Sequence, residues 1–302
     1  MSAPGAAPAA PAAAARAGTD VTGLAGPPAS SRLRAAQAAA VFRLELRRLL
    51  FGRGVLLGAA LGVLPVLLMA GWFAFNRFVE AHPLAEASTV YATMYSGFLV
   101  PLVVFFGCVA AFTQLVRREM RDRTLHYWLL APVRRDLLLA GKFAAGVVAT
   151  FTVFAISAIL SYALAFAPYF GRDGGALSRF FLSGPGVGHL VAYLAATLLA
   201  CVGYGAVFLL FAMLFRNAIL PALAFYGWEW ASFLMPPALK RLTVVHWLHG
   251  LVPVPVADGP FALLAEAPPA WLAAPGLLAF AAVLVAISTW RFRRMEVLYA
   301  DD

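Results

Sequence analysis

The chain has 302 residues, of which 63% are hydrophobic and only 12% are charged, and its formal net charge is +9 at pH 7. Soluble globular domains carry about twice that charged fraction, so the composition excludes an ordinary water-soluble fold. Apolar stretches long enough to cross a hydrocarbon core of about 30 Å recur along the sequence, and they indicate a polytopic membrane protein.

The positive net charge does not indicate nucleic-acid binding. Lys and Arg are concentrated in a few segments between apolar stretches, which is the distribution expected of cytoplasmic loops in a membrane protein. Cys108 and Cys201 both lie inside apolar stretches, and we interpret them as small apolar residues rather than as a disulfide or part of a metal site.

Residues 1–31 consist mainly of Ala, Pro, Gly, Ser and Thr. This composition offers too little apolar side-chain area to offset the entropy of ordering the backbone, so we expect a disordered cytoplasmic tail. The remainder, residues 32–302, is expected to form a single membrane domain.

A basic helix is expected just before the first span. Phe42, Leu46, Leu49 and Leu50 follow the i, i+4, i+7, i+8 spacing of one apolar helical face, whereas Arg43 and Arg47 lie on another flank. Such a helix would lie along the membrane surface, with its arginines beside anionic headgroups. The alternative is that these residues are the first turns of the span itself.

Six membrane-spanning helices are expected, which makes the fold class all-α. The expected spans are Gly54–Phe75, Ala92–Val116, Leu137–Ala167, Val187–Phe215, Ile219–Met235 and Trp271–Trp290. An even number of spans places both termini on one side of the membrane. That side carries 18 of the basic residues and the other side carries 5, so the positive-inside bias predicts cytoplasmic termini.

The segment Arg117–Lys142 connects the second and third expected spans, and its roughly 26 residues exceed what a tight connection between helices needs. Thr124 can cap a short helix over residues 127–130, and Pro132 disrupts its continuation. Asp136 places a favourable negative charge at the start of the next helix. The sequence therefore predicts a short basic and aromatic helix on the cytoplasmic side.

An ordered set of residues runs through this segment: Glu119, then Asp122-Arg123-Thr124-Leu125, Leu129-Leu130, Pro132-Val133-Arg134-Arg135, Leu138 and Gly141-Lys142. This order resembles the cytoplasmic loop in permease subunits of type-2 ATP-binding-cassette (ABC) exporters. Trp228-Glu229 in the fifth expected span, with Leu239–Thr243 and His246–Leu248 after it, is similar to the same family. The resemblance covers most of the chain apart from the Ala/Pro-rich tail.

The resemblance implies that the short helix is a coupling element that docks into a groove on a separate ATPase subunit. Tyr127 and Trp128 would supply apolar anchor area, and the arginines could pair with acidic residues of the partner. The alternative is an anchor of the positive-inside kind, whose aromatic residues only lie at the headgroup level. The residues assigned to the coupling loop are Glu119, Arg123, Thr124, Leu125, Tyr127, Trp128, Leu129, Leu130, Pro132, Arg134 and Arg135.

The chain does not carry its own phosphate-binding loop. Gly141-Lys142 lacks the Walker pattern, because position 136 is Asp rather than Gly and Phe143 occupies the place of the required Ser or Thr. We therefore expect no catalytic residue, no metal site and no cofactor in this chain, with ATP and Mg²⁺ bound by a partner ABC ATPase subunit. The resemblance also implies a second permease copy, in a homodimer or a heterodimer.

Glu229 is the candidate polar residue inside the membrane, where an ionisable group is costly and therefore often functional. Three interpretations are open: a polar group in the translocation path, a hydrogen-bonded lock between helices or protomers, or a residue close enough to the outer interface to be hydrated. The lock is favoured slightly.

Two further motifs have weaker interpretations. Gly54, Gly58 and Gly62 form overlapping GxxxG repeats that would let another helix approach the first span, although such spacing also arises by chance in a chain this rich in Ala and Gly. His246 and His249 could face one another on a short outer helix, but two ligands make no convincing zinc site, so we interpret them as interfacial residues.

The sequence thus predicts a six-span permease subunit of an ABC exporter, which the resemblance places in a bacterial inner membrane. Two alternatives stay open: a stand-alone secondary transporter or channel, and a membrane assembly component that has the permease fold without transporting anything. Apolar spans with few polar side chains are compatible with lipids, hydrophobic drugs or peptides as substrates, so the sequence does not identify a cargo.

Overall fold

The computed structural model describes residues 31–52, 54–76, 84–121, 134–169, 175–254 and 268–294. All regular elements in these ranges are helical, in agreement with the expected all-α class. Within them, five helical segments are long and apolar enough to cross a membrane. They are Leu56–Phe75, Leu84–Leu115, Arg135–Tyr169, Gly186–Leu214 and Ala270–Arg293. They agree with five of the six expected spans.

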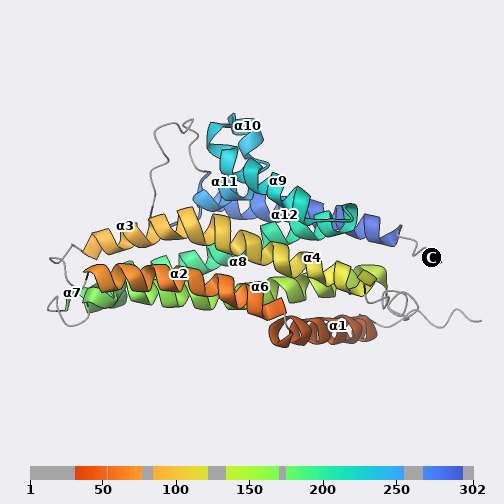
Figure 1. The fold of residues 1–302 in the computed structure, drawn as a ribbon, viewed down its shortest axis with the longest axis horizontal. Helices are drawn as coiled ribbons and strands as arrows, with labels where there is room; N and C mark the ends of the chain where they lie inside the picture. Colours follow the sequence, from red (N-terminus) through yellow and green to blue (C-terminus); the bar gives the residue numbers. More distant parts are fainter. Residues whose placement is uncertain are drawn as a thin grey trace, which may run out of the picture.

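The long helices form an elongated bundle. They are α2 (Gly54–Asn76), the continuous run of α3 (Leu84–Met94), η2 (Tyr95–Val104) and α4 (Phe105–Arg121), then α6 (Arg135–Phe166), α8 (Gly186–Leu214) and α12 (Ala270–Arg293). Figure 1 shows α2, α4, α6 and α8 running along the long axis, and α12 packs against α8. Two short elements, η3 (Ala167–Tyr169) and α7 (Ala176–Leu182), lie between α6 and α8.

The second span differs from the expectation in where it starts and how it is wound. It begins at Leu84 rather than Ala92, and residues Tyr95–Val104 form a π-helix that contains Pro101. Proline lacks the backbone N–H that an α-helix needs at that position, so a local shift to wider hydrogen bonding avoids an unsatisfied carbonyl. The span continues through this segment without ending.

The expected fifth span, Ile219–Met235, is the part of the prediction that the structure does not reproduce in full. Its residues form α9 (Ile219–Trp230) and the short 3-10 helix η4 (Ala231–Leu234). The 12 residues of α9 rise about 18 Å, which is less than the hydrocarbon core, and Pro236 and Pro237 follow shortly after η4. The six-span topology therefore stays a prediction.

The chain turns back after α9. Two short helices, α10 (Pro237–Lys240) and α11 (Val244–His249), follow η4, and the strap formed by α9, η4, α10 and α11 projects from the side of the bundle above α12 in Figure 1. Residues of α11 contact both α8 and α12. The strap therefore returns the chain to the bundle before the last long helix begins.

The core of the bundle surrounds α8, which is mostly buried, whereas the outer faces of α2 and α12 are mostly exposed. A cluster of buried tyrosines joins the helices where α3, α6 and α8 meet. The Tyr91 hydroxyl donates to the carbonyl of Ala158 at 3.0 Å, and the Tyr95 hydroxyl donates to the carbonyl of Tyr193 at 2.9 Å. Because these hydroxyls are satisfied by backbone carbonyls, tyrosine can replace an aliphatic residue in this apolar core.

A separate helix, α1 (Ser31–Phe51), precedes the first span, as expected. It runs alongside α6 and buries Val41 and Glu45 against it, while Arg43 and Arg47 stay exposed. The buried face of α1 is therefore not the one predicted by the apolar spacing. Glu45 faces α6 because its carboxylate pairs with Lys142 of that helix. The expected disordered tail lies outside the described residues.

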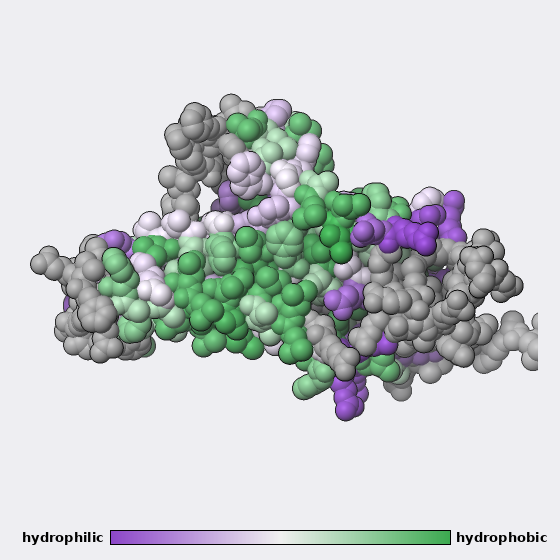
Figure 2. All heavy atoms as spheres, in the orientation of Figure 1, coloured by the Kyte–Doolittle hydropathy of each residue, from purple (hydrophilic) through white to green (hydrophobic). Residues whose placement is uncertain are grey.

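The surface of the molecule is divided into an apolar middle and a hydrophilic end. In Figure 2, apolar side chains cover the middle of the bundle, and hydrophilic side chains gather at the end that carries α1 and the last turn of α12. Exposed apolar residues on α2 include Leu56, Leu57 and Leu67, with exposed fractions of 67%, 52% and 60%. In a membrane these side chains would face either lipid tails or another copy of the chain.

Candidate functional site

The carboxylate of Glu229 lies at the end of α9 and is almost fully buried, with 5% of the residue exposed. Its Oε1 accepts a hydrogen bond from the backbone N–H of Val244 at 2.6 Å, and its Oε2 accepts one from the N–H of Val245 at 3.1 Å. The Tyr204 hydroxyl on α8 donates to Oε2 at 3.3 Å. One carboxylate therefore joins α9, α8 and the start of α11.

The local sequence explains why α11 begins there. Thr243 is the residue before α11, and its side chain accepts a hydrogen bond from the backbone N–H of His246. The first N–H groups of a helix have no partner within the helix, and Thr243 and Glu229 together satisfy three of them. Glu229 thus acts on α11 as an acidic cap supplied from outside the helix.

The strap is also packed against the bundle through two glycines. A Cβ atom on Gly276 of α12 would overlap the ring of Trp247, and one on Gly203 of α8 would come within 3.0 Å of Val244. The Trp247 indole Nε1 donates to the carbonyl of Arg241 at 2.9 Å, which fixes the ring in place. Any larger residue at either glycine would push α11 away from the bundle.

The base of the basic loop is held by a second group of polar contacts. Arg134 precedes α6 and Arg135 is its first residue, so Asp136 lies in the first turn, as expected. The Arg293 guanidinium at the end of α12 donates to both carboxylate oxygens of Asp136. Arg135 donates to the backbone carbonyl of Arg293 at 2.8 Å. The end of the loop is therefore attached to both α6 and α12.

The middle of the predicted coupling loop is not part of this geometry. Glu119 lies in the last turns of α4, and only the helix to which it belongs is described. The remaining loop residues lie outside the described residues: Arg123, Thr124, Leu125, Tyr127, Trp128, Leu129, Leu130 and Pro132. Their assignment to an ATPase contact stays a prediction.

A buried ion pair joins α1 to α6, and sequence reasoning missed it. The Lys142 ammonium donates to Glu45 Oε1 at 2.7 Å, and both side chains are only 3% exposed. Arg48 lies 3.9 Å from the same carboxylate oxygen. The sequence did contain a sign of this pair. Glu45 is the only acid of α1, and Lys142 lies inside α6, the third expected span, where a buried charge is costly unless it is paired.

The GxxxG residues of the first span have different surroundings. Gly62 is buried against α6: a Cβ there would lie 3.3 Å from a methyl carbon of Val153, and Ser157 donates to the Gly62 carbonyl. A Cβ on Gly58 would meet no atom within 4 Å. Gly54 is the first residue of α2. Within this chain, the close helix approach is therefore made at Gly62.

His246 and His249 both lie in α11. Burial lowers the pKa of the His246 imidazole below its usual range, and the neighbouring His249, Lys240 and Arg241 lower it further. Over the described ranges, no three His, Cys, Asp or Glu side chains are grouped closely enough to hold a metal ion.

Comparison with known families assigns the chain. A family model described as ABC-2 family transporter protein matches residues 53–227, which is more than half of the chain and runs from the start of α2 into α9. Among curated proteins, no relative matches the chain. The matched region contains the basic loop and four of the five long apolar segments. The protein therefore belongs to the ABC-2 family of transporter proteins, as an integral membrane component with several apolar helices.

Proposed function

We propose that the protein is the transmembrane permease subunit of an ABC exporter and that a separate cytoplasmic ATPase subunit drives it. The complex would contain two permease copies, in a homodimer or a heterodimer, and two ATPase copies that bind ATP and Mg²⁺. Family membership supports a transporter role. The absence of a Walker pattern around Gly141-Lys142 means that this chain would need a partner to supply the energy.

Orientation is part of the same proposal. The basic residues that flank the long helices favour the side carrying α1, the Arg117–Lys142 segment and the end of α12. The positive-inside bias places that side in the cytoplasm, where an ATPase could reach the loop.

The attachment of the loop to three helices is the observation that carries the coupling mechanism. Asp136 and Arg293 connect the end of the loop to α12, and Lys142 and Glu45 connect the first part of α6 to α1. A displacement of the loop by closing ATPase subunits would therefore be passed to α1, α6 and α12 together. A loop that served only as a charged anchor would have no need of these paired contacts.

Glu229 is assigned a structural role in this mechanism. Its carboxylate oxygens accept hydrogen bonds from Val244, Val245 and Tyr204, which supports the lock among the three interpretations of this residue. The lock would keep α11 attached to α9 and α8 while the long helices move, so that the strap moves as one unit.

The coupling proposal is tested with the double variant Trp128→Ala/Leu129→Ala. Loss of two apolar anchors at a protein interface costs at least about 2 kcal/mol, so we expect roughly 30-fold weaker association with the ABC ATPase, measured by co-purification and titration. Trp271→Ala/Leu272→Ala is the matched control, because these residues are the same pair in an exposed position on α12, far along the helix from Arg293.

Two results would contradict the proposal. Unchanged ATPase binding by the Trp128/Leu129 variant would leave the loop as a topological anchor only. Transport by the purified chain in vesicles without any ATPase would instead support a stand-alone transporter. Cysteine labelling of the loop from each side of the membrane checks that topology is unchanged in both variants.

A further inference from the structure

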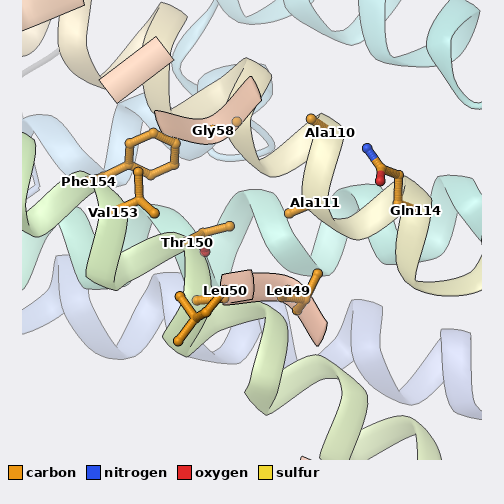
Figure 3. Close-up of a pocket in the computed structure, with 11 residues that line it drawn as sticks. Leu49, Leu50, Gly58, Ala110, Ala111, Gln114, Thr150, Val153 and Phe154 are labelled. Atoms are coloured by element: carbon orange, nitrogen blue, oxygen red, sulfur yellow. The ribbon is translucent and has the colours of Figure 1, made fainter. Parts of the chain in front are cut away.

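A narrow cleft lies between α2, α4 and α6, at the point where α1 ends, and its cavity volume is about 40 Å³. Figure 3 shows Gly58 of α2 and Ala110 and Ala111 of α4 on one side and the side chains of Leu49 and Leu50 on the other. Small residues on α2 and α4 leave this space open. The cleft lies between helices of a single chain and involves none of the contacts at Glu229 or Asp136.

The two ends of the cleft differ in polarity. At one end the Phe154 ring packs over Gly107, where a Cβ atom would overlap the ring, so this end is closed and apolar. Toward the basic loop, Gln114 lines the other end, and its amide makes no hydrogen bond to a described residue. The Thr150 hydroxyl, in contrast, already donates to the carbonyls of its own helix. Gln114 is therefore the polar group that a ligand can use.

The size of the cleft limits what it can hold. About 40 Å³ of cavity is a few times the space that one water molecule requires, and it is far below the 300–1,000 Å³ typical of sites for drug-sized ligands. A space of this volume admits a short run of methylene groups from one acyl chain, whereas it is too small for a fused-ring compound. The neighbouring Leu57 is 52% exposed on the outer face of α2, so the rim of the cleft adjoins the surface available to lipid tails.

Charge near the open end favours an anionic headgroup. Leu50 lines the cleft, and Arg47 and Arg43 precede it by three and seven residues, so both arginines lie on the flank of α1 that borders Leu50. Both arginines are exposed, at about one and two helical turns from Leu50. A phosphate bound there would be followed by the Gln114 amide and then by the apolar interior, which is the order of groups along a phospholipid.

We propose that the cleft binds one acyl chain of an anionic phospholipid from the cytoplasmic leaflet, with Gln114 donating to the ester carbonyl and Arg43 and Arg47 binding the headgroup phosphate. The proposal concerns a lipid that stays with the protein and is independent of the cargo. Occupation of the cleft would join α1 to α2, α4 and α6 at the depth where the inner leaflet begins.

The test is native mass spectrometry of the purified full chain, titrated with palmitoyl-oleoyl phosphatidylglycerol and, separately, with phosphatidylcholine carrying the same chains. We expect one preferred phosphatidylglycerol per chain. Gly58→Leu should weaken its binding at least tenfold, because Gly58 lines the cleft and an added Cβ there meets no atom within 4 Å, so the new side chain would occupy the cleft. Gly71→Leu is the matched control, since a Cβ there also meets nothing within 4 Å but lies outside the cleft.

Further variants separate the acyl chain from the headgroup. Ala111→Leu fills the cleft from α4 instead of α2 and serves as the test if Gly58→Leu proves unstable. Arg43→Gln/Arg47→Gln should reduce phosphatidylglycerol binding about 30-fold and phosphatidylcholine binding much less, because the choline ammonium already neutralises the charge of its phosphate. Arg216→Gln/Arg291→Gln removes the same charge from exposed positions elsewhere and should change neither.

Three results would overturn the proposal. Equal phosphatidylglycerol binding by wild type, Gly58→Leu and Ala111→Leu would show that the lipid does not use the cleft. Equal binding of the two lipids by the wild type would exclude the headgroup site. Dissociation of a dimer by Gly58→Leu, with phosphatidylglycerol per chain unchanged, would assign this face to the second permease copy.

Discussion

Replacing Glu45 with Leu removes one half of the buried ion pair between α1 and α6. In the wild type the Lys142 ammonium lies 2.7 Å from Glu45 Oε1, and both side chains are 3% exposed. The variant leaves the lysine charge buried without that carboxylate. Breaking a buried pair in this way costs about 3–5 kcal/mol, far more than the loss of an exposed pair.

The reverse single variant and the double variant sharpen the prediction. Lys142→Met leaves Glu45 with Arg48 at 3.9 Å, so the expected loss is near the lower end of that range, about 3 kcal/mol. Glu45→Leu/Lys142→Met replaces both charges by apolar side chains of similar size. Since no charge is then left buried at this contact, the double variant should lie within about 1 kcal/mol of the wild type or be more stable.

The assay is thermal unfolding of the purified protein in detergent, followed by tryptophan fluorescence. A loss of 3 kcal/mol lowers the Tm of a protein of this size by about 5 °C. Arg47→Leu on the exposed face of α1 is the control and should leave the Tm nearly unchanged. The reasoning is refuted if Glu45→Leu melts like the wild type, or if the losses of the two single variants simply add in the double variant.

Three further predictions concern the other contacts. Glu229→Gln keeps the size of the side chain, but its amide offers one acceptor oxygen where the carboxylate serves two backbone N–H groups, so we expect a loss of about 1–3 kcal/mol in thermal melts; an unchanged Tm would argue against the lock. Asp136→Asn should cost less than about 1 kcal/mol because its pair with Arg293 is exposed, yet it should lower ATP-driven transport, and exchanging the two residues should restore it. Gly62→Leu should destabilise the protein by about 1–3 kcal/mol, since the added side chain would meet Val153, and a melt equal to that of wild type would contradict the packing of α2 on α6.

Hydropathy located the long helices because their cause is local. A membrane span needs about 20 apolar residues, and it must satisfy its own backbone hydrogen bonds, which a helix does. Neither the apolar length nor the internal hydrogen bonding depends on distant parts of the chain. For this reason the spans that became α2, α6, α8 and α12 were predicted within a few residues of their observed ends. Asp136 was placed correctly at the start of α6 for the same reason, since helix-terminal preferences are local.

The segment from α9 to α11 could not be predicted in the same way. The composition of Ile219–Met235 suits a span, but the observed α9 has 12 residues and its last turn is tied to α11 by Glu229. Which backbone N–H groups a carboxylate will reach depends on where the chain returns after Pro236, and no short-range pattern encodes that path. The sequence identified Glu229 as unusual without showing its partners.

By itself, the sequence determined that this protein is an integral membrane protein of helical class, with a basic loop between its second and third spans and the motif order of an ABC-2 transporter. Those properties follow from composition and local spacing. Tertiary structure alone decided that Lys142 pairs with Glu45, that Arg293 holds Asp136, and that Gly58 borders a cleft while Gly62 packs against α6. Each of these depends on two helices that are distant in sequence meeting at a particular height and rotation, which hydropathy does not specify.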